Sequence, residues 1–169
     1  INRGPSMLLG PVLDSIRAAS ILKNLHSLHI RMTRHSANAL YLAEKFRDSG
    51  LDVHYPGLPT HPQHALMSRV MNQGFGFGGI VAVDIGAEAK ANQLMKRMQE
   101  EKIGYLAVSL GYFKTLFSPP GHSTSSEIPA DERHKMGMGD GLIRFSVGLD
   151  NDIQRTWGTI EGLLREVGV

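Results

Sequence analysis

The segment GFGFGGIVAVDI, residues 74–85, joins a glycine cluster to a strongly apolar run. Gly74, Gly76 and Gly79 have the G-x-G-x-x-G spacing of a dinucleotide-binding turn. In such a turn a strand comes first, and the N-terminus of the helix that follows faces the pyrophosphate. Here a helical pattern ends near residue 73 and the apolar strand comes after the glycines. We therefore interpret the glycines as a helix stop and a flexible entry into a central strand.

Apolar periodicity along the rest of the chain predicts helices interleaved with strands. Helices are expected over residues 12–23, 27–48, 60–70, 87–101, 130–136 and 153–167, and strands over 51–55, 80–85, 105–108 and 142–147. Thr60 is the expected N-cap of the third helix, and residues 4–11 and 111–129 are expected to be loops. This order predicts one domain over 1–169, an α/β fold of the α+β sandwich kind, with helices covering a sheet of about four strands.

The helix over 27–48 is expected to bury one face and to expose the other. The predicted inward residues are Leu28, Met32, Ala39, Leu42, Ala43 and Phe46. The predicted solvent side comprises Arg31, Arg34, Asn38, Lys45 and Arg47.

Composition excludes several classes of site. The chain has no cysteine, which rules out disulfides, thiolate metal sites and cysteine nucleophiles and fits a cytoplasmic location. The formal net charge of +2 is too small to indicate a nucleic-acid binder, and no apolar run reaches the roughly 20 residues of a membrane span. The start, INRGP, is neither an initiator Met nor a signal peptide, so we expect a piece that begins within a longer protein.

Two short motifs contain residue types found in metal sites and in nucleophilic catalysis, but their spacing favours ordinary structural roles. His61 and His64 lie one helical turn apart with His54 upstream, yet no further ligand completes a metal site, so none is predicted. GHSTSSE, residues 121–127, contains a Ser next to a His, but neighbouring loop residues rarely meet as nucleophile and base. The run DERHK, residues 131–135, is typical of a solvated helical face.

Arg144 is the most informative charged residue. It interrupts the strand LIRFSV, residues 142–147, in which Leu142 and Ser146 share its face. A buried arginine needs an anion, and its planar guanidinium matches a carboxylate with two hydrogen bonds. That anion is either an internal Asp or Glu or the carboxylate of a ligand, and the pattern alone leaves both open.

Five motifs together resemble a known family. VHYPGLPTHPQH, FGFGGIVAVDI, LAVSLG, SSE and GLIRFSVGLD occur in the order and approximate spacing of the C-terminal domain of the Cys/Met-metabolism family of pyridoxal-phosphate (PLP) enzymes. The resemblance covers the chain from about residue 4 to its end and is strongest to the plant-type, methionine-cleaving branch. It implies the C-terminal small domain of fold-type I PLP enzymes.

The resemblance also implies roles for five positions. Arg144 matches the arginine that binds the substrate's α-carboxylate, Ser109 matches a serine that helps to seat that carboxylate, and Leu110 follows in the pocket wall. Val108 stands where relatives acting on cystathionine have an acidic or aromatic residue, so it suits the thioether of methionine. Thr124 falls in the loop that borders the active site.

The reaction implied is γ-elimination from methionine to 2-oxobutanoate, methanethiol and ammonia, with PLP as electron sink. The family's Schiff-base lysine follows a threonine in an N-terminal domain, and no lysine here follows a threonine. We therefore expect no catalytic or cofactor-binding residue in this chain, which needs the N-terminal PLP domain of the same enzyme as its partner. A homotetramer is expected from the family. The alternatives are a cystathionine lyase or synthase, or a noncatalytic truncated fragment that serves in assembly.

Overall fold

A computed structural model describes residues 12–123 and 125–169 of the chain. The loop predicted over 4–11 and the candidate site residue Thr124 lie outside the described residues. The chain divides into two compact units, the first ending at Arg31 and the second spanning Met32–Val169. No helix in the described part of the chain has the length and apolar character that crossing a membrane requires.

The first unit contains the helix α2, Ser15–Leu25, and the start of α3, Leu28–Asp48. Asp14 caps α2, because its carboxylate accepts hydrogen bonds from the backbone N–H groups of Ile16 and Arg17. The helix predicted over 12–23 is therefore present. No residue of α2 is buried, however, and its apolar side chains such as Ile16 remain exposed.

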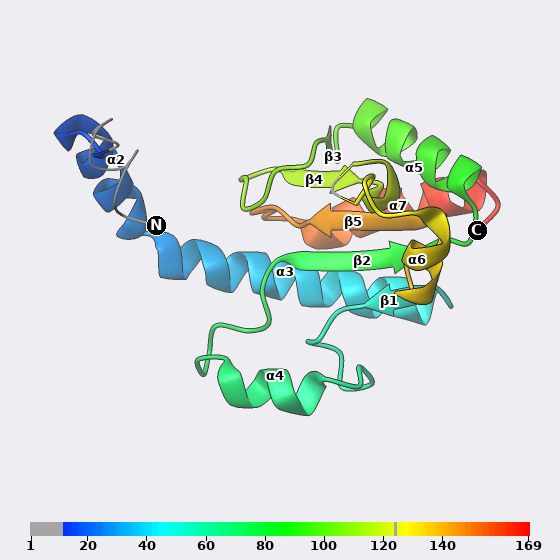
Figure 1. The fold of residues 1–169 in the computed structure, drawn as a ribbon, viewed down its shortest axis with the longest axis horizontal. Coiled ribbons are helices and arrows are strands. Elements are labelled where there is room, and N and C mark those ends of the chain that lie inside the picture. Colours follow the sequence, from blue (N-terminus) through cyan, green and yellow to red (C-terminus); the bar gives the residue numbers. More distant parts are fainter. Residues whose placement is uncertain (1–11, 124) are drawn as a thin grey trace. The chain divides into compact units, whose positions relative to one another are not determined.

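The second unit is built on one mixed five-stranded sheet, in the order β1-β2-β5-β4-β3 (Figure 1). The strands are β1 (Asp52–His54), β2 (Ile80–Asp84), β3 (Gly104–Leu106), β4 (Thr115–Ser118) and β5 (Leu142–Ser146). The β3–β4 pair is parallel and the other three pairs are antiparallel. The expected α+β sandwich is confirmed, with five strands where the sequence predicted about four.

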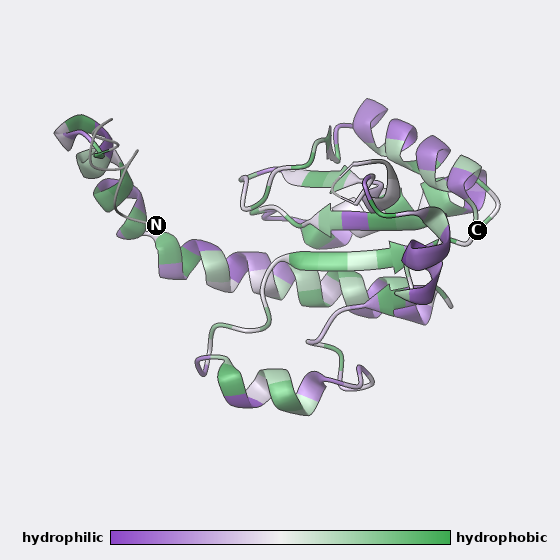
Figure 2. Ribbon diagram, in the orientation of Figure 1, coloured by the Kyte–Doolittle hydropathy of each residue, from purple (hydrophilic) through white to green (hydrophobic). Residues whose placement is uncertain are grey.

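Three helices bury one face of this sheet: α3 from Met32 onward, α5 (Glu88–Glu100) and α7 (Ile153–Glu166). Figure 1 shows α3 and α7 behind the sheet, and Figure 2 shows β2 as largely hydrophobic, whereas a hydrophilic band interrupts β5. Phe46 centres the core, with its ring 5.3 Å from that of Phe145 and edge-on to that of Trp157 at 5.2 Å. The apolar side chains Ala91, Leu94, Met95 and Met98 of α5, and Trp157, Ile160, Leu163 and Leu164 of α7, are buried.

Buried polar side chains on α3 attach the segment after β5 to the helix. His35 Nδ1 lies 2.6 Å from the carbonyl oxygen of Val147, and the Asn38 amide donates to the carbonyls of Gly148 and Asp150, both at 2.9 Å. The prediction that Asn38 faces solvent is therefore wrong, because its amide satisfies backbone carbonyls that no strand pairs. Of the predicted inward residues, Leu28 is exposed and Met32 only partly buried.

Two further predictions differ from the structure. The helix expected to be capped by Thr60 is α4, His64–Val70, which begins four residues after Thr60 because consecutive turns through Leu58 and His61 precede it. The loop predicted over 111–129 contains β4, whose four residues are all buried, and a short 3₁₀ helix, η1 (Pro120–His122). It is followed by α6, Ala130–Lys135, as predicted.

The glycine-rich segment is a structural connection, in the order that the sequence predicts: α4 precedes it and β2 follows. Gly74, Gly76 and Gly78 have φ values of +83°, +71° and +87°, which favour glycine. The backbone N–H of Gly78 donates to Ser36 Oγ at 3.0 Å, and its carbonyl accepts from the Tyr55 hydroxyl at 2.8 Å. Side chains of α3 and the β1 end thus hold this segment in place.

Candidate functional site

Arg144 lies in the middle of the sheet, on the face opposite the core. Its neighbours in β5, Ile143 and Phe145, are buried in the core, so alternation turns Arg144 to the other face. Ala82 of β2 and Ser118 of β4 are its direct cross-strand partners. The side chain is partly buried, and no carboxylate among the described residues forms an ion pair with it.

Hydrogen bonds bring the segment after β3 against this strand. The Arg144 guanidinium donates through Nη2 to the carbonyl oxygen of Val108 at 2.8 Å. Two residues beyond Ser109, the backbone N–H of Gly111 donates to Ser146 Oγ at 3.2 Å. The structure therefore places residues 108–111 beside Arg144, although the two segments are more than 30 positions apart in sequence.

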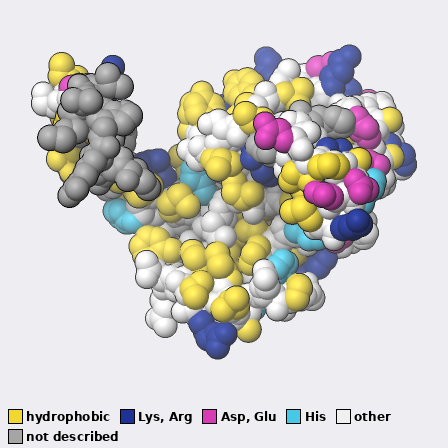
Figure 3. All heavy atoms as spheres, in the orientation of Figure 1, with side chains coloured by type: hydrophobic (Ala, Val, Ile, Leu, Met, Phe, Trp, Pro, Cys, Tyr) yellow, Lys and Arg dark blue, Asp and Glu magenta, His cyan; other side chains and the backbone are white. Residues whose placement is uncertain are grey.

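The side chains of that segment face solvent. Val108 and Leu110 are 54% and 59% exposed, and Ser109 is also exposed. They continue a run of exposed apolar side chains that extends from Tyr105 to Phe113. Figure 3 shows hydrophobic side chains gathered near the β3 end of the sheet and over α4. Beside the Arg144 guanidinium there is therefore an accessible apolar surface that a thioether could contact.

Ser118 belongs to this site but was missed by sequence reasoning. Its hydroxyl oxygen and Arg144 Nε are buried and find no hydrogen-bond partner among the described residues. An unpaired guanidinium N–H and an unpaired hydroxyl are rare in protein interiors. The only sequence signal was the short apolar run TLFS, which stands among glycines and prolines and was therefore assigned to a loop.

The histidines considered as metal ligands have other contacts. His64 Nδ1 lies 2.8 Å from the carbonyl oxygen of Pro56, and its ring packs on Phe77 with centroids 5.1 Å apart. His61 Nδ1 accepts from the backbone N–H of Gln63. Within residues 12–123 and 125–169, no group of three or more His, Asp or Glu side chains is arranged to hold a metal ion.

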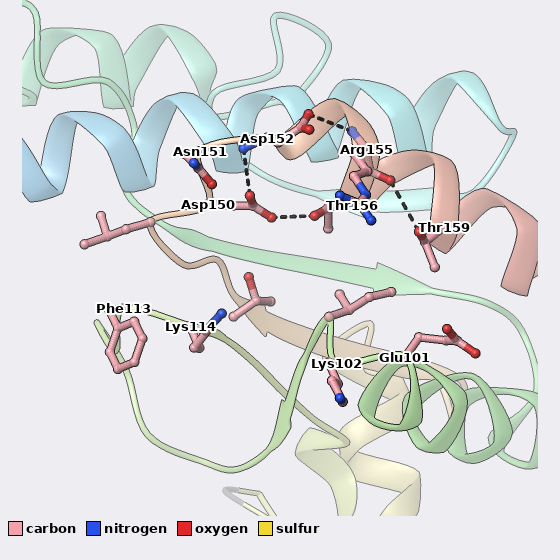
Figure 4. A pocket seen from close by; sticks show the side chains of 13 residues that line it. Glu101, Lys102, Phe113, Lys114, Asp150, Asn151, Asp152, Arg155, Thr156 and Thr159 are labelled. Atoms are coloured by element: carbon pink, nitrogen blue, oxygen red, sulfur yellow. Dashed lines mark hydrogen bonds between the residues drawn. The ribbon is translucent and has the colours of Figure 1, made fainter.

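A hollow of the second unit lies on the other side of the sheet from Arg144. It has a volume of about 580 Å³ and is bounded by the α5–β3 turn, the start of β4 and the start of α7 (Figure 4). Asp150 accepts from the Thr156 hydroxyl at 2.5 Å and from the backbone N–H of Asp152, and Asp152 caps α7. Asp150 and Asp152 therefore serve the local fold, and none of the predicted site residues lines the hollow.

The residues around Arg144 fit a carboxylate better than they fit a carbonyl cofactor. A Schiff base requires a lysine, and none of the five strands contains one. Three lysines of the described residues have contacts elsewhere: Lys45 lies over the Tyr41 ring, Lys90 donates to the carbonyl of Gly168, and Lys135 lies near Asp131. The strands around Arg144 thus supply a cation for an anionic ligand and contain no lysine.

A family model decides the affiliation of the chain. The model of the Cys/Met metabolism PLP-dependent enzymes matches residues 4–154. The chain belongs to this family. Its fold is that of the C-terminal part of fold-type I PLP enzymes, as the sequence motifs predicted.

Curated relatives and solved structures agree with this assignment. The chain is 42% identical over 162 residues to a methionine gamma-lyase of Arabidopsis thaliana, and 35% identical over 144 residues to a cystathionine beta-lyase of Coxiella burnetii. These alignments cover 95% and 84% of this chain. A cystathionine gamma lyase from Micromonospora echinospora superposes with a TM-score of 0.79 at 32% identity, covering 97% of this chain and 41% of that one.

A crystal structure described as a putative O-acetylhomoserine (thiol)-lyase from Campylobacter jejuni superposes with a TM-score of 0.81 at 26% identity, covering 96% of this chain and 37% of that one. That structure contains a pyridoxyl-lysine phosphate. The chain spans 37% of the length of the Arabidopsis relative and 36% of the Coxiella relative.

Proposed function

We propose that this chain is the substrate-recognition part of a PLP-dependent carbon–sulfur lyase that cleaves methionine by γ-elimination. The observation that carries the proposal is the position of Arg144, a partly buried guanidinium without a carboxylate partner among the described residues. Its hydrogen bond to Val108 engages one terminal nitrogen with a neutral carbonyl, so its charge remains uncompensated. A carboxylate would compensate that charge and accept two parallel hydrogen bonds.

In this proposal Arg144 binds and orients the substrate and moves no proton. By fixing the α-carboxylate it sets the direction of the bond that breaks, which is a positioning role. Ser109 and Leu110 form the rim beside it, and the family motif alone assigns Thr124 to substrate binding as well. The lysine and the cofactor chemistry come from an N-terminal PLP domain, and the assembly is a cytoplasmic homotetramer.

Two observations favour methionine as the substrate over cystathionine. The side chain of Val108 is apolar and exposed next to Arg144, so it suits a methylthioether and offers no charge to a second amino-acid head group. The chain is also 42% identical to a protein named methionine gamma-lyase. Comparing kcat/KM for L-methionine and L-cystathionine separates the two activities.

The decisive experiment uses the natural gene product that carries this chain, loaded with PLP. Arg144→Ala should raise KM for L-methionine by about 100-fold, because a charged bidentate contact is lost. Arg144→Lys should recover only part of this loss, since an ammonium keeps the charge but not the planar pair of donors. Methioninamide, which has no carboxylate, is the matched probe, and its turnover should be nearly insensitive to both substitutions.

Equal effects of Arg144→Ala on methionine and on methioninamide would refute the carboxylate assignment. The noncatalytic alternative is tested separately by adding PLP to the natural gene product and recording its visible spectrum and lyase activity. A product that forms no internal aldimine and releases no methanethiol would overturn the lyase proposal.

A further inference from the structure

Two buried polar atoms without partners among the described residues, Ser118 Oγ and Arg144 Nε, come from directly paired strand positions. Directly opposed residues of an antiparallel pair point to the same face, with Cβ atoms roughly 4.5–5.5 Å apart. The two side chains therefore leave β4 and β5 side by side. Because both unpaired atoms come from one pair of facing positions, we interpret them as two parts of one site and not as two separate packing defects.

The chemistry of the two atoms is complementary. Arg144 Nε carries one N–H and can only donate, whereas the Ser118 hydroxyl oxygen has two lone pairs and can accept. Serine has three staggered χ1 positions, so rotation about one bond redirects its oxygen without moving the strand. Ser118 is only 3% exposed, so water does not compete freely for either atom.

The present contact of the guanidinium indicates when such a bond would form. Nη2 donates to the backbone carbonyl of Val108, while Nε has no hydrogen-bond partner among the described residues. A carboxylate that takes two parallel hydrogen bonds needs the guanidinium plane turned toward the ligand and held there. A fixed acceptor at Nε sets the orientation of that plane.

We propose that Ser118 is a positioning residue for the substrate carboxylate: its hydroxyl oxygen accepts the Arg144 Nε–H and fixes the guanidinium plane, so that the terminal nitrogens face the carboxylate. This inference rests on the proposed function, because it gives Arg144 the carboxylate as ligand. Ser118 acts through Arg144 and does not contact the reacting atoms. Its contribution therefore depends on the guanidinium.

The test uses the natural gene product that carries this chain, loaded with PLP, and steady-state kinetics with L-methionine. Ser118→Ala should raise KM by about fivefold to tenfold, the size expected for one net hydrogen bond, and should change kcat much less. Ser118→Thr keeps the hydroxyl and should restore KM to within about twofold of the parent. Methioninamide should show no comparable change in KM with Ser118→Ala.

A double-mutant cycle separates positioning from a general packing effect. In the Arg144→Lys background no Nε–H of a guanidinium remains, so Ser118→Ala should have little further effect on KM. An equal KM increase in both backgrounds, or an equal increase for methioninamide, would overturn the role of Ser118. A large Arg144→Ala effect together with an unchanged KM in Ser118→Ala would refute this inference alone, whereas an unchanged KM in Arg144→Ala would refute the proposed function as well.

Discussion

The hydroxyl of Tyr55 donates to the carbonyl oxygen of Gly78 across 2.8 Å, so the residue that follows β1 holds the glycine-rich segment that enters β2. Tyr55 is fully buried, and its hydroxyl has no access to water in place of this acceptor. The N–H of the same glycine donates to Ser36 Oγ on α3. Two side chains from different elements therefore satisfy both polar groups of one glycine, and they set where the central strand begins.

Tyr55→Phe should lower the free energy of unfolding by about 1–3 kcal/mol, because it leaves the partly buried Gly78 carbonyl without this donor while the ring still fills the core. Urea unfolding followed by circular dichroism measures the change. Tyr112→Phe is the matched control, since Tyr112 is 44% exposed. Removing its hydroxyl should change the free energy of unfolding by less than about 0.5 kcal/mol. Equal effects of the two substitutions would show that the Tyr55 hydroxyl adds nothing to stability.

Stability should fall at alkaline pH through the same residue. Burial raises the pKa of the Tyr55 hydroxyl above the ordinary tyrosine value of about 10. Above that value the unfolded chain releases the proton while the folded protein keeps it, so the unfolded state binds fewer protons and the free energy of unfolding decreases with pH. The stability that depends on protonated Tyr55 is fully present below about pH 10. Above that pH, the free energy of unfolding falls by up to about 1.4 kcal/mol per pH unit.

Urea midpoints measured between pH 8.5 and 11 in the parent and in Tyr55→Phe isolate this effect. The difference between the two proteins removes the titration of lysines and of the other tyrosines. The stability difference should shrink as pH rises past 10. A difference that stays constant across this range would contradict the linkage to Tyr55.

The elements that periodicity predicted well are those with one clearly apolar face or a continuous apolar run. The apolar patterns over 80–85 and 153–167 correctly predicted β2 and α7, because burial in a single core imposes the spacing of hydrophobic side chains. The glycine segment was also interpreted correctly, since the order of helix, glycines and strand is visible in the sequence alone.

The parts that sequence reasoning missed depend on polar groups whose partners are distant in sequence. Asn38 was predicted to face solvent. It is buried, and its amide donates to backbone carbonyls 110 and 112 positions away in the sequence. β4 is only four residues long and lies among glycines and prolines, so its burial follows from its neighbours β3 and β5 and not from its own pattern. Because β4 was not predicted, Ser118 was not predicted as a site residue either. Only Arg144, of the two residues with an unpaired buried polar atom, was identified from the sequence.

Two glycines of the same segment should respond differently to alanine. Both Gly74 and Gly76 have positive φ, so alanine at either position costs about 1–2 kcal/mol of backbone strain. A Cβ at position 74 meets nothing within 4 Å, whereas a Cβ at position 76 would lie 2.7 Å from the Cβ of Ser36. Gly76→Ala should therefore cost about 1–3 kcal/mol more than Gly74→Ala, because the helix or the loop has to move.

Thermal and urea unfolding of these two variants tests the packing of this segment on α3. The φ values of the two glycines differ by only 12°, so each variant serves as the strain control for the other. A greater loss of stability in Gly74→Ala than in Gly76→Ala would show that the contact with Ser36 does not limit this segment.

Val108 offers a test of the substrate site that leaves Arg144 itself unchanged. Its backbone carbonyl accepts from the guanidinium at 2.8 Å, while its side chain is 54% exposed, so substitution should leave the core intact. Val108→Glu introduces a carboxylate that can pair with the guanidinium and compete with the substrate. In the natural gene product loaded with PLP, KM for L-methionine should rise by about tenfold.

Val108→Gln is the control for this substitution, since it matches the size and polarity of glutamate without the charge. It should change KM by less than about threefold, and added salt should narrow the gap between the two variants because an exposed ion pair is screened. The comparison separates loss of the apolar contact, which both variants share, from competition for the guanidinium. Equal KM values for the two variants would mean that the carboxylate of methionine does not bind to the charge of Arg144.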